Sequence, residues 1–377
     1  MNDYSLLQNI PSFSPVVRSI STTRDCRLTA VSGSDGKLAI YAVPSLRLVY
    51  GPRFIPSPSS ACAITALAWS AVTGGILFVG DVSSVVRLIQ LGPVQKPGLG
   101  ALYMLSTLVD LKDGEIQSIA IFGDRVAVST LTRVTLMNEV FRDQGTLGVS
   151  LAGHFTISHS QPPIYQTPSA LFFMNKSTLI VTYSERGAIA WNIDQRDCVW
   201  KIDIEPDGIF HASLSPDGRK LVTTSHSQHV NWYTITKKSP SAPQVDLDQT
   251  VSLRCASALV LHLNNDIVVV YSQFDNSLRI VSPDVTRDVQ TLQLPRNRGV
   301  PAPAFVSTVD VGSDGPLRYI IAATTLQNNS YAPSTISIWA GTCGSITSPC
   351  QQNSMYCLWA FYERYAGDRP LVLQIDA

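Results

Sequence analysis

Two groups of residues in this chain have types and spacings that could support chemistry. Cys343, Cys350 and Cys357 are evenly spaced by seven residues, a pattern that suggests a metal or redox cluster. Zinc sites instead use ligands in pairs two to four residues apart with a second pair elsewhere, and the sequence shows no such pairs. His226 and His229 lie in one turn, but neither a thiol nor a carboxylate accompanies them. We therefore expect no metal site and no cofactor.

Motifs that mark the common enzyme classes are missing from the sequence. It contains no GxSxG elbow, no HExxH zinc motif and no GxxxxGK[ST] phosphate loop. The glycine-containing segment Gly33 to Lys37 is too short to cradle phosphates and is predicted to form a hairpin turn. A catalytic triad drawn from distant strands would leave no such local pattern. We predict that the protein is not an enzyme.

Charge and composition narrow the classes of partner. The 377 residues include 28 basic and 28 acidic ones, so the formal net charge is zero and gives no strong nucleic-acid signal. The first residues, MNDYSLLQNIPSF, lack the basic start and apolar stretch of a secretory signal. The longest apolar run, Met355 to Tyr362, is too short for a transmembrane segment. With seven thinly spread cysteines, we expect an intracellular protein, cytoplasmic or nuclear.

The elements that must position any site are arranged as a repeat. A short apolar run, a tight turn, a second run, another turn and a third run recur along the chain, with copies starting near Val17, Ile64, Ile116, Ser169, Phe210, Ala258 and Val306. The runs are rich in β-branched and aromatic residues, as in Leu179 to Tyr183, which favours strands. Asp35-Gly36, Asp217-Gly218 and Asp314-Gly315 suit the tight turns of hairpins. An all-strand repeat of roughly 40 to 50 residues indicates a β-propeller.

We therefore predict an all-β fold, a seven-bladed β-propeller of four-stranded antiparallel blades that fills residues 1–377 as a single domain. The blades are expected near residues 14–50, 64–108, 116–153, 168–204, 208–254, 257–294 and 304–341, with 342–377 as a C-terminal closing or packing segment.

Residues 14 to 341 resemble the WD-repeat β-propellers. The best match is 209 to 235, where an apolar strand, an SPDG turn and an aromatic-rich third strand follow one another. The sequence departs from the family because no third strand ends in Trp-Asp; Trp191-Asn192 is nearest. The resemblance implies an Asp between the second and third strands that supports hydrogen bonds within a blade. Asp35, Asp81 and Asp275 stand near such positions.

The resemblance also implies how the ring is closed, because the family commonly pairs an N-terminal strand with the last blade. Ser5 to Ile10 could form this strand here. Met355 to Tyr362 or Leu371 to Ile375 could supply it instead. We favour N-terminal closure, with the C-terminal segment packed outside the ring.

The long connectors between copies are the predicted binding elements. Residues 51–63, 154–168 and 295–304 join one copy to the next, and the resemblance implies that they share one face. Two other loops, 92–100 and 236–243, are expected on the opposite face. The connectors contain residue types that are enriched at binding hot spots, namely Arg53, Phe54, Tyr165, Arg296 and Arg298.

The leading functional prediction is a non-catalytic protein–protein interaction scaffold. We expect it to bind other proteins or peptides through its loop faces, as a monomer within an intracellular multiprotein complex. One alternative is a propeller enzyme whose active site lies at the central channel, where Arg18 and His211 could point inward. A polar pocket with a strongly shifted pKa would favour it. Another alternative is recognition of phosphoinositides or modified peptides through Arg296 and Arg298.

Overall fold

The structure is a computed structural model. Within the residues that it describes, every secondary-structure element is a β-strand. Several predicted features lie outside the described residues: Tyr165, Arg296, Arg298, Asp275, His226, Asp314-Gly315, loop 92–100, the three evenly spaced cysteines and the whole segment 343–377. The described residues are 3–13, 16–23, 25, 27–55, 62–70, 75–91, 102–142, 146–153, 167–184, 187–203, 208–225, 229–239, 242–252, 260–262, 266–272, 277–283, 290–294, 305–310, 317–324 and 335–342.

The described strands form seven four-stranded antiparallel sheets, which we call blades. The first four, in strand order, are blade 1 with β2 (Val17–Thr22), β3 (Leu28–Gly33), β4 (Lys37–Ala42) and β5 (Leu48–Phe54); blade 2 with β6 (Ile64–Trp69), β7 (Ile76–Asp81), β8 (Val85–Leu91) and β9 (Leu102–Asp110); blade 3 with β10 (Ser118–Phe122), β11 (Arg125–Ser129), β12 (Val134–Arg142) and β13 (Thr146–Gly153); and blade 4 with β14 (Pro168–Asn175), β15 (Thr178–Tyr183), β16 (Gly187–Asn192) and β17 (Asp197–Asp203).

The remaining blades follow the same order except for the last. They are blade 5 with β18 (His211–Leu214), β19 (Lys220–Thr224), β20 (His229–Ser239) and β21 (Ala242–Ser252); blade 6 with β22 (Val260–His262), β23 (Val268–Ser272), β24 (Ser277–Val281) and β25 (Gln290–Gln293); and blade 7 with β26 (Phe305–Asp310), β27 (Leu317–Thr324), β28 (Thr335–Thr342) and β1 (Asp3–Pro11).

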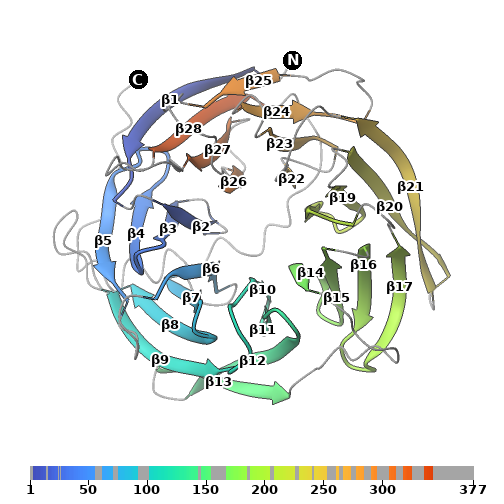
Figure 1. The fold of residues 1–377 in the computed structure, drawn as a ribbon, viewed down its shortest axis with the longest axis horizontal. Helices are drawn as coiled ribbons and strands as arrows, with labels where there is room; N and C mark the ends of the chain where they lie inside the picture. Colours follow the sequence, from blue (N-terminus) through green and yellow to red (C-terminus); the bar gives the residue numbers. More distant parts are fainter. Residues whose placement is uncertain are drawn as a thin grey trace.

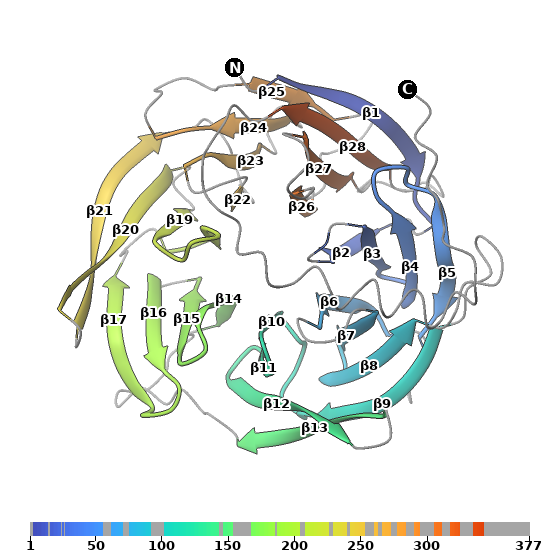
Figure 2. The ribbon, with the colours of Figure 1, turned by 180° about the vertical axis from the view of Figure 1, so that it is seen from behind.

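The blades are arranged side by side around a central axis, as Figures 1 and 2 show from the two sides. The first strand of each blade lies nearest the centre, and the fourth lies at the rim. The prediction of an all-β propeller with four-stranded antiparallel blades is confirmed.

The ring is closed by the N-terminal strand. β1 pairs with β28 in antiparallel register from Asp3 opposite Thr342 to Pro11 opposite Thr335, with an irregularity between Leu6 and Gln8. In Figure 1 the blue β1 runs along the outer side of the orange-red β28. The first strand of the chain and the last described strand therefore share one sheet, which confirms the preferred closure and covers the outer edge of β28.

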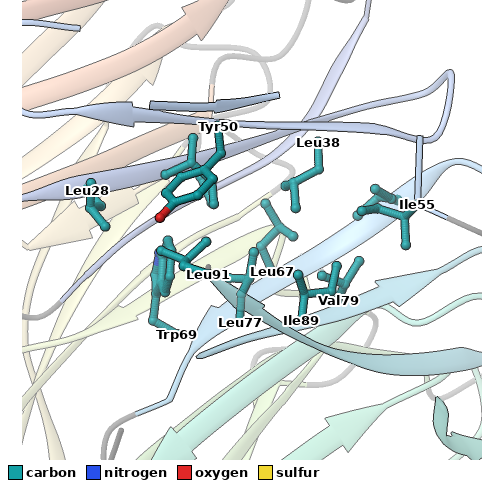
Figure 3. Packing of buried hydrophobic residues seen from close by; sticks show 13 residues of the cluster. Leu28, Leu38, Tyr50, Ile55, Leu67, Trp69, Leu77, Val79, Ile89 and Leu91 are labelled. Carbon is teal, nitrogen blue, oxygen red and sulfur yellow. The ribbon is translucent and has the colours of Figure 1, made fainter. Parts of the chain in front are cut away.

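Apolar packing between neighbouring blades makes the core. Every residue of β3 and β7 is buried, because each of these strands is covered on both faces by adjacent sheets. Between blades 1 and 2 the buried side chains include Leu38, Tyr50 and Trp69 (Figure 3). The Trp69 Nε1–H also donates to the Ser21 carbonyl across this seam, at 3.0 Å. Burial of this kind stabilises the fold by roughly 25 cal/mol per Å² of apolar surface.

The connectivity of the strands gives the propeller two loop faces. Because neighbouring strands are antiparallel, the turns between second and third strands lie on the same face as the blade-to-blade connectors, which we call the connector face. The turns between first and second strands, and between third and fourth strands, lie on the opposite face.

The loop predicted at residues 236–243, on the opposite face, was drawn too long. β20 continues to Ser239 and β21 begins at Ala242, so that Thr236 pairs with Gln244 and Lys237 with Pro243. Within this hairpin, Pro243 lacks a backbone N–H. It lies on an outer strand, where a missing donor on one edge is tolerated.

Candidate functional site

Arg53 and Phe54 belong to the rim strand of blade 1 and not to a connector. β5 continues to Phe54, with Arg53 opposite Leu38 and Phe54 opposite Lys37. The N–H of Ile55 then donates to the Gly36 carbonyl at 3.1 Å. The predicted connector 51–63 therefore starts too early, because its first residues complete the β4–β5 ladder. Both side chains still lie at the connector-face end of the strand.

Phe54 is the most exposed of the large apolar side chains in the described part of the chain, at 60%. The Lys37 ammonium lies 5.0 Å from the centroid of its ring, within the range of a cation–π contact. Lys37 also forms an ion pair with Asp35, with 2.8 Å between Nζ and Oδ2. The ring therefore faces solvent while one side of it is held by the neighbouring turn. The preceding residue of the strand, Arg53, is also exposed.

Gly51 permits the bulge that carries Arg53 and Phe54 to this position. Its φ is +82°, and a Cβ atom there would lie 2.4 Å from the Leu38 carbonyl oxygen. We expect Gly51→Ala to lower the free energy of unfolding by at least about 2 kcal/mol, from backbone strain plus this clash. Urea denaturation measures the change. Gly123→Ala is the matched control, because Gly123 has a φ of +58° but open space around its Cβ position. Equal losses for the two variants would contradict the clash.

In blade 2, Asp81 organises the turn between the second and third strands. Its Oδ1 accepts hydrogen bonds from the Ser83 N–H at 2.9 Å, the Ser83 hydroxyl at 2.7 Å and the Val85 N–H at 3.2 Å. Its Oδ2 forms an ion pair with Arg87, and both side chains are 2% exposed. Asp81 thus has the role that the WD-repeat resemblance implied. At Asp35 the equivalent contact is a single bond from the Lys37 N–H at 3.3 Å, besides the ion pair.

The connector between blades 2 and 3 is fixed from both sides. The Asp113 N–H donates to the Ser84 hydroxyl of blade 2 at 3.1 Å. The Asp113 carboxylate accepts hydrogen bonds from the Thr130 and Thr132 hydroxyls of blade 3 at 2.6 and 2.5 Å. Its Oδ2 also lies 3.1 Å from Arg133 Nε. These contacts make the connector face rigid at the boundary of the two blades.

Two further exposed apolar side chains lie on this face. Val82 in the β7–β8 turn is 41% exposed, and Leu131 in the β11–β12 turn is 43% exposed. Together with Phe54, each of blades 1, 2 and 3 presents one such side chain on the connector face. Our sequence analysis missed Val82 and Leu131, although an apolar residue within an otherwise polar tight turn was a usable signal.

The opposite face carries an aromatic contact between blades 3 and 4. The rings of Phe122 and Phe173 have their centroids 6.2 Å apart, and Phe122 is 42% exposed. Two ion pairs link the same blades: Lys176 with Asp124 at 3.1 Å and Arg125 with Asp194 at 2.9 Å. The Lys176 side chain lowers the pKa of Asp124. The pKa of Asp194 is lowered by a hydrogen bond from Ser177 and then by Arg125.

Arg18 and His211, the residues proposed for a central active site, lie on the first strands of blades 1 and 5. Arg18 is exposed on β2, whereas the half-buried His211 on β18 accepts a hydrogen bond at Nδ1 from the Val260 N–H of blade 6, at 3.3 Å. Burial lowers the pKa of His211 to about 4. The lowered pKa of His211 therefore arises where blades 5 and 6 meet.

Within the described ranges, no three His, Cys, Asp or Glu side chains are grouped so that they could hold a metal ion. The same part of the chain contains no helix with the length and hydrophobicity needed to cross a membrane. Tyr165, Arg296 and Arg298 remain predictions, because they lie outside the described residues.

Comparison with known proteins supports the fold. No family model and no curated protein sequence matches the chain. Among solved structures, the chain is similar to the β-propeller domain of Cps50 (Swd1) from Myceliophteria thermophila, with a TM-score of 0.63 and 13% sequence identity. The similarity covers 89% of this chain and 99% of that domain. At this identity the likeness establishes the β-propeller architecture.

Proposed function

We propose that the chain is a seven-bladed, degenerate WD-repeat propeller that acts as a non-catalytic scaffold within an intracellular protein complex. Its partner binds the connector face over blades 1 to 3. The observation that carries the proposal is the row of exposed apolar side chains on this face, Phe54, Val82 and Leu131, one from each of three consecutive blades.

The surroundings of these three side chains favour binding of a protein. The contacts of Lys37 hold the turn next to Phe54, the contacts of Asp81 hold the turn that carries Val82, and Asp113 binds the two threonines that flank Leu131. A surface that is already ordered loses little conformational entropy when a partner binds. The centre of a protein interface is typically apolar, and the exposed Arg53 is of a residue type enriched at hot spots.

A combined substitution tests the proposed surface. We expect Phe54→Ser/Val82→Ser/Leu131→Ser to reduce recovery of a stoichiometric partner at least about 10-fold in native co-purification quantified by mass spectrometry, since removal of hot-spot residues typically weakens binding by 2 kcal/mol or more. The matched control is Phe122→Ser/Leu247→Ser, which removes exposed apolar side chains elsewhere on the molecule. Circular dichroism and melting curves check that both variants fold.

The proposal fails if the unmodified protein returns no stoichiometric partner under native conditions. It also fails if the two variants lose the partner equally, because the effect would then reflect general surface polarity. Loss confined to the control variant would move the interface to another face.

A further inference from the structure

Two histidines hold the first strands of blades 5 and 6 together. The His211 Nδ1 on β18 accepts a hydrogen bond from the Val260 N–H on β22. Two residues along both strands, the His262 N–H donates to the Ser213 hydroxyl at 3.0 Å, and His262 Nδ1 lies 3.1 Å from the same oxygen. In the tautomer of His262 that carries its proton on Nε2, the Ser213 hydroxyl donates its own hydrogen to Nδ1 while its oxygen accepts the His262 N–H. In this tautomer both imidazoles serve as acceptors at Nδ1.

An imidazole accepts a hydrogen bond only while that nitrogen is unprotonated. A proton on His211 Nδ1 would face the Val260 N–H, so two donors would point at each other. A proton on His262 Nδ1 would make this nitrogen a second donor to Ser213 Oγ, so the hydroxyl hydrogen would have to turn away from the contact. Burial also opposes charge at both sites, and it lowers the pKa of each imidazole from 6.5 to about 4.

The charged groups around the two imidazoles do not offset the effect of burial on their pKa values. Lys220, Asp217 and Asp266 face His262; the two aspartates raise its pKa and Lys220 lowers it, but burial remains the largest influence. Lys220 and Asp266 also pair with each other at 2.6 Å. On the described strands packed against β18 and β22, which are β14, β19, β23 and β26, the remaining titratable residues are Tyr271 and Asp310.

We infer that the seam between blades 5 and 6 is an acid-operated gate: protonation of His211 removes the acceptor of the Val260 N–H, protonation of His262 displaces the Ser213 hydroxyl hydrogen, and the ring opens there. Opening would expose the apolar cluster that includes Val222, Trp232 and Val260, in which Trp232 is 2% exposed. The gate goes beyond the proposed scaffold, because it lies away from blades 1 to 3.

The sign of the pH dependence follows from the lowered pKa values. The closed seam favours neutral imidazoles, so their stabilisation is complete above pH 6.5 and is lost as the pH falls toward 4. With an ordinary pKa in the open form, the opening equilibrium constant at pH 5 should exceed that at pH 7.5 roughly 30-fold for each histidine.

Hydrogen–deuterium exchange on the full chain tests the gate, after correction for the intrinsic effect of pH on exchange. Protection of peptides that cover 211–214 and 260–262 should fall between pH 7.5 and pH 5 by at least about 30-fold. Peptides from the blade 1 and blade 2 seam should keep their protection, because the described contacts across that seam, such as the Trp69 bond to Ser21, involve no histidine.

Matched variants test whether the two histidines cause the loss of protection at low pH. His211→Asn/His262→Asn places an amide oxygen near each Nδ1 position, so the seam keeps acceptors that cannot be protonated, and its protection should become independent of pH. His229→Asn alters a half-buried histidine outside this seam and should retain the pH response. If the double variant does not fold, Ser213→Ala should shift the opening to higher pH. The gate would be overturned by an equal loss of protection at all seams or by no loss at pH 5. It would also be overturned if the double variant kept the pH response of the unmodified protein.

Discussion

Asp81→Ala is expected to lower the free energy of unfolding by about 3 to 5 kcal/mol, because it removes the carboxylate that pairs with a buried guanidinium. The Arg87 and Asp81 side chains are both 2% exposed, so water cannot readily replace the lost contact. The substitution also removes the acceptor for the Ser83 and Val85 N–H groups. Since the same turn presents Val82, we expect partner binding to weaken as well.

Equilibrium urea denaturation of three variants separates the buried pair from an ordinary ion pair. Asp35→Ala breaks the partly exposed pair with Lys37 and should lower stability by no more than about 1 kcal/mol. Asp81→Leu/Arg87→Met should recover only the part of the loss that comes from the buried charge, because two apolar side chains leave no charge but do not replace the acceptor of the Ser83 and Val85 N–H groups. Asp81→Ala and Asp35→Ala with equal stabilities would contradict a special role for the blade 2 pair.

The propeller could be predicted from the sequence because its signal is local and repeated. Each blade needs apolar strands at a fixed period with turn residues between them. The role of Asp81 in its turn and N-terminal closure were instead implied by the resemblance to WD-repeat propellers, and alternatives for the closing strand remained until the register of β1 with β28 was known. Local pattern thus determined the elements but left their pairing partly open.

The candidate surface was harder to predict, because exposure depends on packing between distant segments. Gly51 and Pro52 suggested a loop, whereas the rim strand tolerates both residues and places Arg53 in the ladder. Val82 and Leu131 resemble core residues until the turns that carry them are placed on the connector face. His262 reaches Ser213 only through a contact 49 residues apart in the chain, which no local pattern reveals.

Deletion of residues 1–11 should have the largest effect on the fold, because it removes β1 and leaves β28 as an open edge. Eight residue pairs join these strands, from Asp3 opposite Thr342 to Pro11 opposite Thr335. With a net stabilisation of about 1 kcal/mol or less for each backbone hydrogen bond, the loss should amount to about 5 kcal/mol. The unpaired edge should also promote association between molecules.

Chemical denaturation and size-exclusion chromatography measure these two consequences. Deletion of residues 1–2 alone is the control, because β1 begins at Asp3 and its pairing is retained. A synthetic peptide of residues 3–11, added in trans, should restore the unfolding midpoint of the truncated protein in a concentration-dependent way, since it binds only the folded state. A peptide with the same composition in scrambled order should not, because the alternation of its side chains would no longer match β28. An unchanged midpoint after truncation would show that pairing of β1 with β28 contributes little to closure of the ring.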